Sequence, residues 1–208
     1  MRGFVLESYV RFQSCERNDI SWCHYRSNEV STEDPIMQKA IIAEAIAIAV
    51  ATTALFAAGG AKMKITSSAF QEGGDIPSKF SRDGGNANPP LRIEGTPANA
   101  KSLVLIVDDP DAPVGLFTHW LVWNIDPKTT EIPEKGVPKG AVQGTNDYPN
   151  LGYGGPQPPS GTHRYYFKIF ALDQTLGLRS GAKRQELDKA MSGHVVAEGQ
   201  LMGRYTRK

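Results

Sequence analysis

From Met63 onward, apolar residues occur in short runs separated by glycine and proline. Three of these runs, at residues 101–108, 119–125 and 165–172, are rich in β-branched or aromatic residues and predict strands. Pro110 follows the first run, as expected where a strand ends, because a strand interior needs its backbone N–H groups. Short strands without a repeated strand–helix rhythm bury their apolar faces best as stacked sheets. The sequence therefore predicts a mainly β fold, an antiparallel sandwich.

Three further features of this part of the chain are predicted from local pattern. Residues 183–191 favour a helix, and Gly193 is placed to end it in a left-handed conformation. Residues 195–205 alternate loosely and suggest an edge strand. The stretch 133–162 is dense in glycine, proline, asparagine and aspartate, and it is longer than loops normally run without a function. We expect it to form one wall of a binding site.

The chain has 208 residues, which suits one domain with an appendage. We expect residues 1–36, which are polar and patternless, to be a disordered extension, and residues 63–208 to form the domain. The segment 37–62 is mostly apolar and ends in small residues. It is interpreted as an export signal, as a membrane anchor, or as an alanine-rich helix without targeting value. A signal would place the protein in the periplasm, and otherwise we expect it in the cytoplasm.

Composition restricts the partners of the domain. The net charge of +1 gives no strong field, so nucleic acid is not expected as a partner. Both cysteines, Cys15 and Cys23, precede Met37, so the domain is expected to do without disulfides, thiolate-bound metals or a nucleophilic thiol. A small molecule or another protein is the expected partner.

Carboxylates follow the first predicted strand. Asp108 and Asp109 alternate along it, so only one of them can face a given pocket. Asp109 is the candidate for the pocket wall. Asp111 also lies in the site region, but its side chain suits a turn, where aspartate bonds nearby backbone N–H groups.

Two histidines open the next two strands. His119 and His163 can each present N–H groups to an anion, and an imidazole gains charge as the pH falls through about 6.5. Tyr165 shares a face with His163, whereas Arg164 points the other way and is expected to form a structural ion pair. Gly155 allows close approach of its backbone amide to an anion.

Several motifs occur together and in order: Asp109-Pro110-Asp111-Ala112-Pro113, then His119-Trp120, then Gly154-Gly155-Pro156 and Gly161-Thr162-His163-Arg164-Tyr165. Over residues 63–207 the sequence thereby resembles the phosphatidylethanolamine-binding protein family, in its bacterial, Raf-kinase-inhibitor-like branch. The resemblance implies a large central antiparallel sheet, a smaller second sheet and a peripheral helix near the C-terminus. It also implies a ligand site, with no catalytic residue, metal or cofactor. The implied site residues are Asp109, His119, Gly155, Pro156, His163 and Tyr165.

The resemblance further implies the kind of ligand and partner. A phosphate-containing small molecule or a phospholipid head group is expected in the pocket, with peripheral membrane contact, and inhibition of a kinase or protease is a family activity. The connection 114–118 is short, and no additional helix follows Tyr205, so we expect an open mouth with little apolar cover for acyl chains.

Two other functions stay open at this point. His119, His163 and Asp109 could form the ligand set of a metal-dependent enzyme. The domain could also be a protein-interaction module whose pocket is vestigial. Serine hydrolysis is less favoured, because the sequence has no Gly-x-Ser-x-Gly motif and Ser160 lies in a proline-rich turn.

Overall fold

A computed structural model of the chain describes residues 61–207. The extension expected at 1–36 and nearly all of the signal-like segment expected at 37–62 lie outside the described residues. No helix within 61–207 is long and apolar enough to cross a membrane. The elements in chain order are β1 (Ala61–Lys62), β2 (Lys64–Thr66), the 3₁₀ helix η2 (Ser78–Phe80), β3 (Leu91–Glu94), β4 (Ser102–Asp109), β5 (Phe117–Ile125), β6 (Glu131–Ile132), β7 (Val142–Gln143), β8 (Thr162–Leu172), α2 (Arg184–Met191) and β9 (Val195–Thr206).

The strands form two sheets. The larger has six strands in the order β1-β9-β8-β4-β5-β7, and the smaller has three in the order β2-β3-β6. Neighbouring strands are antiparallel throughout, except that β1 runs parallel to β9. Within residues 61–207 the predicted mainly β sandwich is confirmed, with a large sheet, a small sheet and a peripheral helix near the C-terminus.

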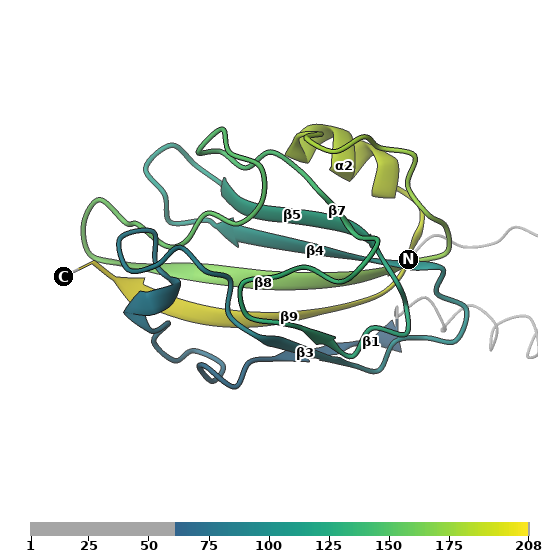
Figure 1. The fold of residues 1–208 in the computed structure, drawn as a ribbon, viewed down its shortest axis with the longest axis horizontal. Helices are drawn as coiled ribbons and strands as arrows, with labels where there is room; N and C mark the ends of the chain where they lie inside the picture. The colour runs from purple at the N-terminus through teal and green to yellow at the C-terminus, as the bar shows by residue number, and fades with distance from the viewer. Residues whose placement is uncertain (1–60, 208) are drawn as a thin grey trace, which may run out of the picture. The chain divides into compact units, whose positions relative to one another are not determined.

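Strand β4 lies between β8 and β5, and all eight of its residues are buried. Its alternate residues Leu103, Leu105 and Val107 join the larger core cluster, which also contains Ile65 and Ile93 of the small sheet. The intervening residues face the other way, toward α2. Figure 1 shows α2 beside β4 and β5, and β3 beside β9. Because both faces of β4 are covered, side chains at its end are held on a rigid support.

The second core cluster lies between the large sheet and α2. Val104 and Ile106 of β4 pack there with Leu187 and Met191 of the helix. At the start of the helix, the backbone N–H of Lys183 donates to the Glu186 carboxylate at 2.8 Å, which satisfies an N-terminal amide. At its end, Gly193 has a φ of +81°. The predicted helix and its glycine stop are confirmed.

Strand β9 is not the edge strand that the sequence suggested. Its outer side pairs with β1, and beyond β1 the N–H groups of Gly73 and Ile76 donate to Met202 and Arg204 at 2.8 and 2.7 Å. Alternation along a strand indicates which surface of the sheet each side chain faces. It does not indicate whether another segment is hydrogen-bonded to each edge of the strand. The covering segment lies more than a hundred residues earlier in the chain, so local pattern could not reveal it.

Candidate functional site

A cavity of about 280 Å³ opens where the end of β4 meets the starts of β5 and β8. Four of the six predicted site residues line it: Asp109, His119, His163 and Tyr165. The rest of the lining comes from the β4–β5 connection, from the first residue of β5 and from the long loop before β8. These other lining residues are Ala112, Pro113, Val114, Phe117, Tyr148, Gln157, Pro158 and Pro159. The expectation that the 133–162 stretch forms one wall is therefore met by Tyr148 and by residues 157–159.

A β-bulge directs His119 into this cavity. Val107 pairs with Trp120, but the next residue, Asp108, pairs with Thr118, so β5 contains one extra residue at His119. Trp120 already faces the core between the sheets. Regular alternation would turn His119 toward α2, whereas at a bulge two successive side chains can share a face. The bulge places the imidazole 5.1 Å, between ring centroids, from both Phe117 and Tyr165.

The ring of His119 is fixed by the loop opposite it. Its Nδ1 lies 2.6 Å from the carbonyl oxygen of Gly154, and the N–H of Gly154 donates to the His119 carbonyl at 2.8 Å. A carbonyl only accepts, so Nδ1 carries the proton and donates. Burial lowers the pKa of His119 below its ordinary value, although the Gly154 carbonyl and Asp109 act in the opposite direction. A neutral ring with Nδ1–H leaves Nε2 as an acceptor.

His163 is held by Asp109. Its Nδ1 lies 2.7 Å from one carboxylate oxygen of Asp109, and both side chains are buried. The other carboxylate oxygen accepts the backbone N–H of Asp111 at 2.8 Å. A carboxylate orients an imidazole in this way by accepting its Nδ1 proton. Asp109 therefore acts on the ligand site through His163. As in His119, Nε2 is the ring nitrogen of His163 that has no protein partner among the described residues.

Asp111 and Arg164 form the structural pair expected from alternation. The guanidinium donates to both carboxylate oxygens, at 2.9 and 2.6 Å, and the Arg164 backbone N–H donates as well. These hydrogen bonds from Arg164 hold the pKa of Asp111 at about 2. The pair joins the β4–β5 connection to the start of β8, outside the cavity lining.

The two aspartates that end β4 face opposite sides, as predicted. Asp108 is fully buried on the α2 side, where Lys168 and Arg184 contact its two oxygens. Asp109 faces the cavity side. Only Asp109 is therefore available to the site.

Tyr165 lies on the same face as His163, two residues along β8, as predicted. Its hydroxyl is buried and has no hydrogen-bond partner among the described residues. Burial raises the pKa of Tyr165, and the negative charge of Asp109 raises it further. The side chain is therefore a neutral phenol with an unused donor at the cavity.

Gly155 and Pro156 do not line the cavity, contrary to the prediction. The Gly155 amide, expected to be bare, donates to the Asn86 side chain at 2.7 Å. A Cβ at Gly155 would lie 2.4 Å from the Phe80 carbonyl oxygen, so glycine is needed here for close packing of two loops. The Pro156 carbonyl likewise accepts the N–H of Arg82 at 3.1 Å. Both residues hold the wall in place, and the Gly155 N–H and the Pro156 carbonyl are already bonded within the protein.

Sequence reasoning missed Tyr148 and the residue that positions it. The Tyr148 ring stacks edge-on against Phe117 and His119, at centroid distances of 4.8 and 5.5 Å. Its loop is held by buried Asn146, whose side-chain oxygen accepts the N–H groups of Tyr148 and Asn150 and whose amide donates to Gly152. The run Asn146-Asp147-Tyr148-Pro149-Asn150 contains a recognisable turn signal, since asparagine commonly binds backbone two residues on.

The arrangement of the predicted metal ligands does not suit a metal. No group of three or more histidine, cysteine, aspartate or glutamate side chains in the described part of the chain could hold a metal ion. At the site, Asp109 accepts the Nδ1 proton of His163 and the Gly154 carbonyl accepts that of His119, so the two Nε2 atoms are left, and they make fewer than three ligands. The metal-dependent enzyme suggested as an alternative gains no support from this geometry.

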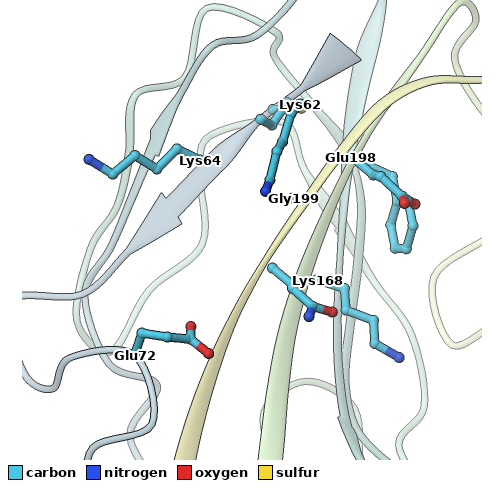
Figure 2. A pocket seen from close by; sticks show the side chains of 9 residues that line it. Lys62, Lys64, Glu72, Lys168, Glu198 and Gly199 are labelled. Carbon is cyan, nitrogen blue, oxygen red and sulfur yellow. The ribbon is translucent and has the colours of Figure 1, made fainter. Parts of the chain in front are cut away.

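A larger hollow, of about 1070 Å³, lies over β1, β8 and β9 and contains none of the predicted site residues. Its charged side chains are of both signs. Figure 2 shows that Lys64 and Glu72 lie on one side of the β9 ribbon, and that Glu198 and Lys168 lie on the other. These groups do not converge on a common point, so we place the candidate site at the smaller cavity.

Comparison with known proteins identifies the same family that the sequence motifs resemble. The family model described as phosphatidylethanolamine-binding protein matches residues 66–206. A UPF0098 protein of Pyrococcus abyssi is 53% identical over 160 residues, covering 72% of this chain and 89% of its own. Its counterpart in Pyrococcus horikoshii is 48% identical and covers 84% of this chain and 92% of its own.

Two crystal structures are also similar. A homologue of phosphatidylethanolamine-binding protein from Chlamydia trachomatis superposes with a TM-score of 0.68 at 43% identity, covering 71% of this chain and 99% of its own. YbcL of E. coli, described as a member of the mammalian family, gives a TM-score of 0.67 at 30% identity, covering 71% of this chain and 100% of its own.

Proposed function

This chain belongs to the phosphatidylethanolamine-binding protein family, and we propose that its cavity binds the phosphate of a small molecule or of a phospholipid head group without catalysing a reaction. One observation carries the proposal. Both histidines that line the cavity have Nδ1 engaged by a protein acceptor, which leaves Nε2 of each ring for a ligand. The unused Tyr165 hydroxyl adds a third polar group.

The two imidazoles have different roles in this proposal. His163 already donates from Nδ1 to Asp109, so donation from Nε2 to an anion requires the imidazolium form. Binding an anion there takes up a proton, and the resulting charge is balanced by Asp109. His119 has a pKa lowered by burial and stays neutral, so its Nε2 accepts a hydrogen bond from a P–OH group or from an ammonium group.

The size of the cavity suits a head group and not a whole lipid. Pockets for drug-sized ligands usually measure about 300–1,000 Å³, and this one measures about 280 Å³. Pro113, Val114, Pro158 and Pro159 give the mouth apolar edges. A phosphate-bearing group of a few heavy atoms fits this space, whereas acyl chains would stay outside it.

The contacts of the two imidazoles favour binding over catalysis. Neither ring bonds a serine or threonine hydroxyl within residues 61–207, so no nucleophile is paired with a base there. Inhibition of a kinase or protease, which the family resemblance implies, remains a prediction.

Sulfate is a suitable probe because it stays a dianion between pH 6 and pH 8. We expect isothermal titration to give tighter sulfate binding at pH 6 than at pH 8, with net proton uptake measurable in buffers of different ionisation enthalpy. His163→Gln should remove both the proton uptake and most of the affinity. Equal affinity at the two pH values would contradict the role given to His163.

His194→Gln is the matched control. His194 also bonds an aspartate, with its Nδ1 2.9 Å from Asp173, but this pair is solvent-exposed and does not line the cavity. We expect this variant to bind sulfate as the wild type does. If the wild-type protein shows no anion binding by titration or by chemical-shift change at His163, the protein-interaction module with a vestigial pocket becomes the better interpretation.

A further inference from the structure

The cavity lacks a permanent positive charge of its own. Its lining includes one carboxylate, Asp109, and no lysine or arginine. Even when His163 is protonated, the Asp109–His163 pair is neutral as a unit. A phosphate with two negative charges therefore needs a cation from outside the lining, since an anion in a half-enclosed site is costly to leave uncompensated.

Arg82 is the cation placed to supply it. The guanidinium carbon lies 3.9 Å from the centroid of the Tyr148 ring, and Tyr148 lines the cavity. The next residue, Asp83, accepts a hydrogen bond at 2.5 Å from Gln157, which also lines the cavity. Two separate contacts thus hold the 82–83 segment at the rim.

The charge of Arg82 is not balanced by a carboxylate. No aspartate or glutamate in the described residues 61–207 forms an ion pair with it, whereas the neighbouring Asp83 is paired with Arg207 at 2.8 Å. Its position is instead set by the Tyr148 ring and by its backbone N–H, which donates to Pro156. A cation–π contact of a partly exposed arginine contributes only about 0.5–1 kcal/mol, so a phosphate can displace the ring as its partner.

We propose that Arg82 determines the charge selectivity of the cavity, so that phosphate monoesters, which carry two charges, bind in preference to phosphodiesters, which carry one. This inference rests on the proposed function. A guanidinium binds a phosphate through two parallel N–H donors, and a terminal phosphate group presents more free oxygens for this than a diester does. The ligand class is then a free phosphomonoester and not the diester head group of an intact lipid.

The experiment compares O-phosphoethanolamine, a monoester, with glycerophosphoethanolamine, a diester, by titration at pH 7. The monoester is then mostly dianionic, because the second pKa of such phosphates is about 6. We expect the wild type to prefer the monoester. Arg82→Gln should weaken monoester binding about tenfold, equivalent to about 1.4 kcal/mol, and leave diester binding nearly unchanged. Arg82→Lys should keep part of the preference, because it keeps the charge.

Arg92→Gln is the matched control, since Arg92 is an exposed arginine on β3 of the small sheet, away from the cavity. It should bind both ligands as the wild type does. Equal weakening of both ligands in Arg82→Gln would make Arg82 a structural support of Tyr148, and an unchanged preference would also overturn the inference. If the wild type binds neither phosphate ligand nor sulfate, the failure lies instead with the proposed function.

Discussion

The two faces of β4 end in neighbouring carboxylates with opposite environments. Asp108 is fully buried against α2, where two permanent cations, Lys168 and Arg184, contact it. Asp109 faces the cavity and has a single imidazole, His163, as its side-chain partner. Fixed cations keep the first site in one charge state at ordinary pH, whereas an imidazole can change its charge. One face is therefore built for stability and the other for response to a ligand.

The largest effect is expected on the α2 face. Asp108→Asn leaves Lys168 and Arg184 without their shared carboxylate, and breaking a buried ion pair commonly costs 3–5 kcal/mol. Both cations keep some contact with solvent, so we expect a loss of about 3 kcal/mol in the free energy of unfolding. Urea unfolding followed by tryptophan fluorescence measures it. A loss below about 1 kcal/mol would mean that the two faces do not differ in the way described.

A smaller loss of stability is expected on the cavity face. Asp109→Asn keeps an oxygen that can accept a hydrogen bond, so we expect a loss of about 1 kcal/mol. The larger change is in the His163 ring, which no longer has a carboxylate to hold its proton on Nδ1. Nitrogen NMR of the imidazole should show one tautomer in the wild type and a mixture in the variant. A wild-type ring protonated at Nε2 alone would refute the assignment.

The pH dependence of stability should also come from the cavity face. Burial lowers the pKa of His119 in the folded protein, so the unfolded chain binds a proton more readily at this position. Its contribution to stability is complete above the ordinary pKa of about 6.5 and declines as the pH falls below it. We expect His119→Gln to flatten the fall in unfolding free energy between pH 7 and pH 5. An unchanged slope in His119→Gln would contradict this assignment.

The smallest effect is expected at the rim, where Asp111 pairs with Arg164. Arg164 is exposed and Asp111 is partly exposed, so Asp111→Asn should change the urea midpoint least of these variants. Because the pKa of Asp111 is lowered from 3.8 to about 2, its contribution is present above pH 3.8 and is lost as the pH falls through 2. The difference in urea midpoint between Asp111→Asn and the wild type should be constant from pH 5 to pH 8 and disappear near pH 2. A difference that grows on acidification would contradict this sign.

Sequence reasoning recovered those features that depend on local pattern. The four long strands β4, β5, β8 and β9, the helix before Gly193 and the opposite orientations of Arg164 and Tyr165 follow from periodicity along one segment, whereas the short strands of the small sheet were not predicted. Features that depend on pairing between distant segments were missed. The acceptor of the Gly155 amide, Asn86, lies 69 residues away along the chain, so composition alone made the amide look free. The cover over β9 escaped prediction for the same reason.

The extra residue of β5 at His119 has an implication for how this pocket can change over evolution. A substitution changes only the side chain at one position. A deletion beside His119 would restore regular pairing and move the imidazole to the opposite face of the sheet, beneath α2. The loss of recognition would then be abrupt, because a strand cannot gain or lose a fraction of a residue. Length variation in this short segment is therefore expected to separate relatives that share the fold but not the ligand.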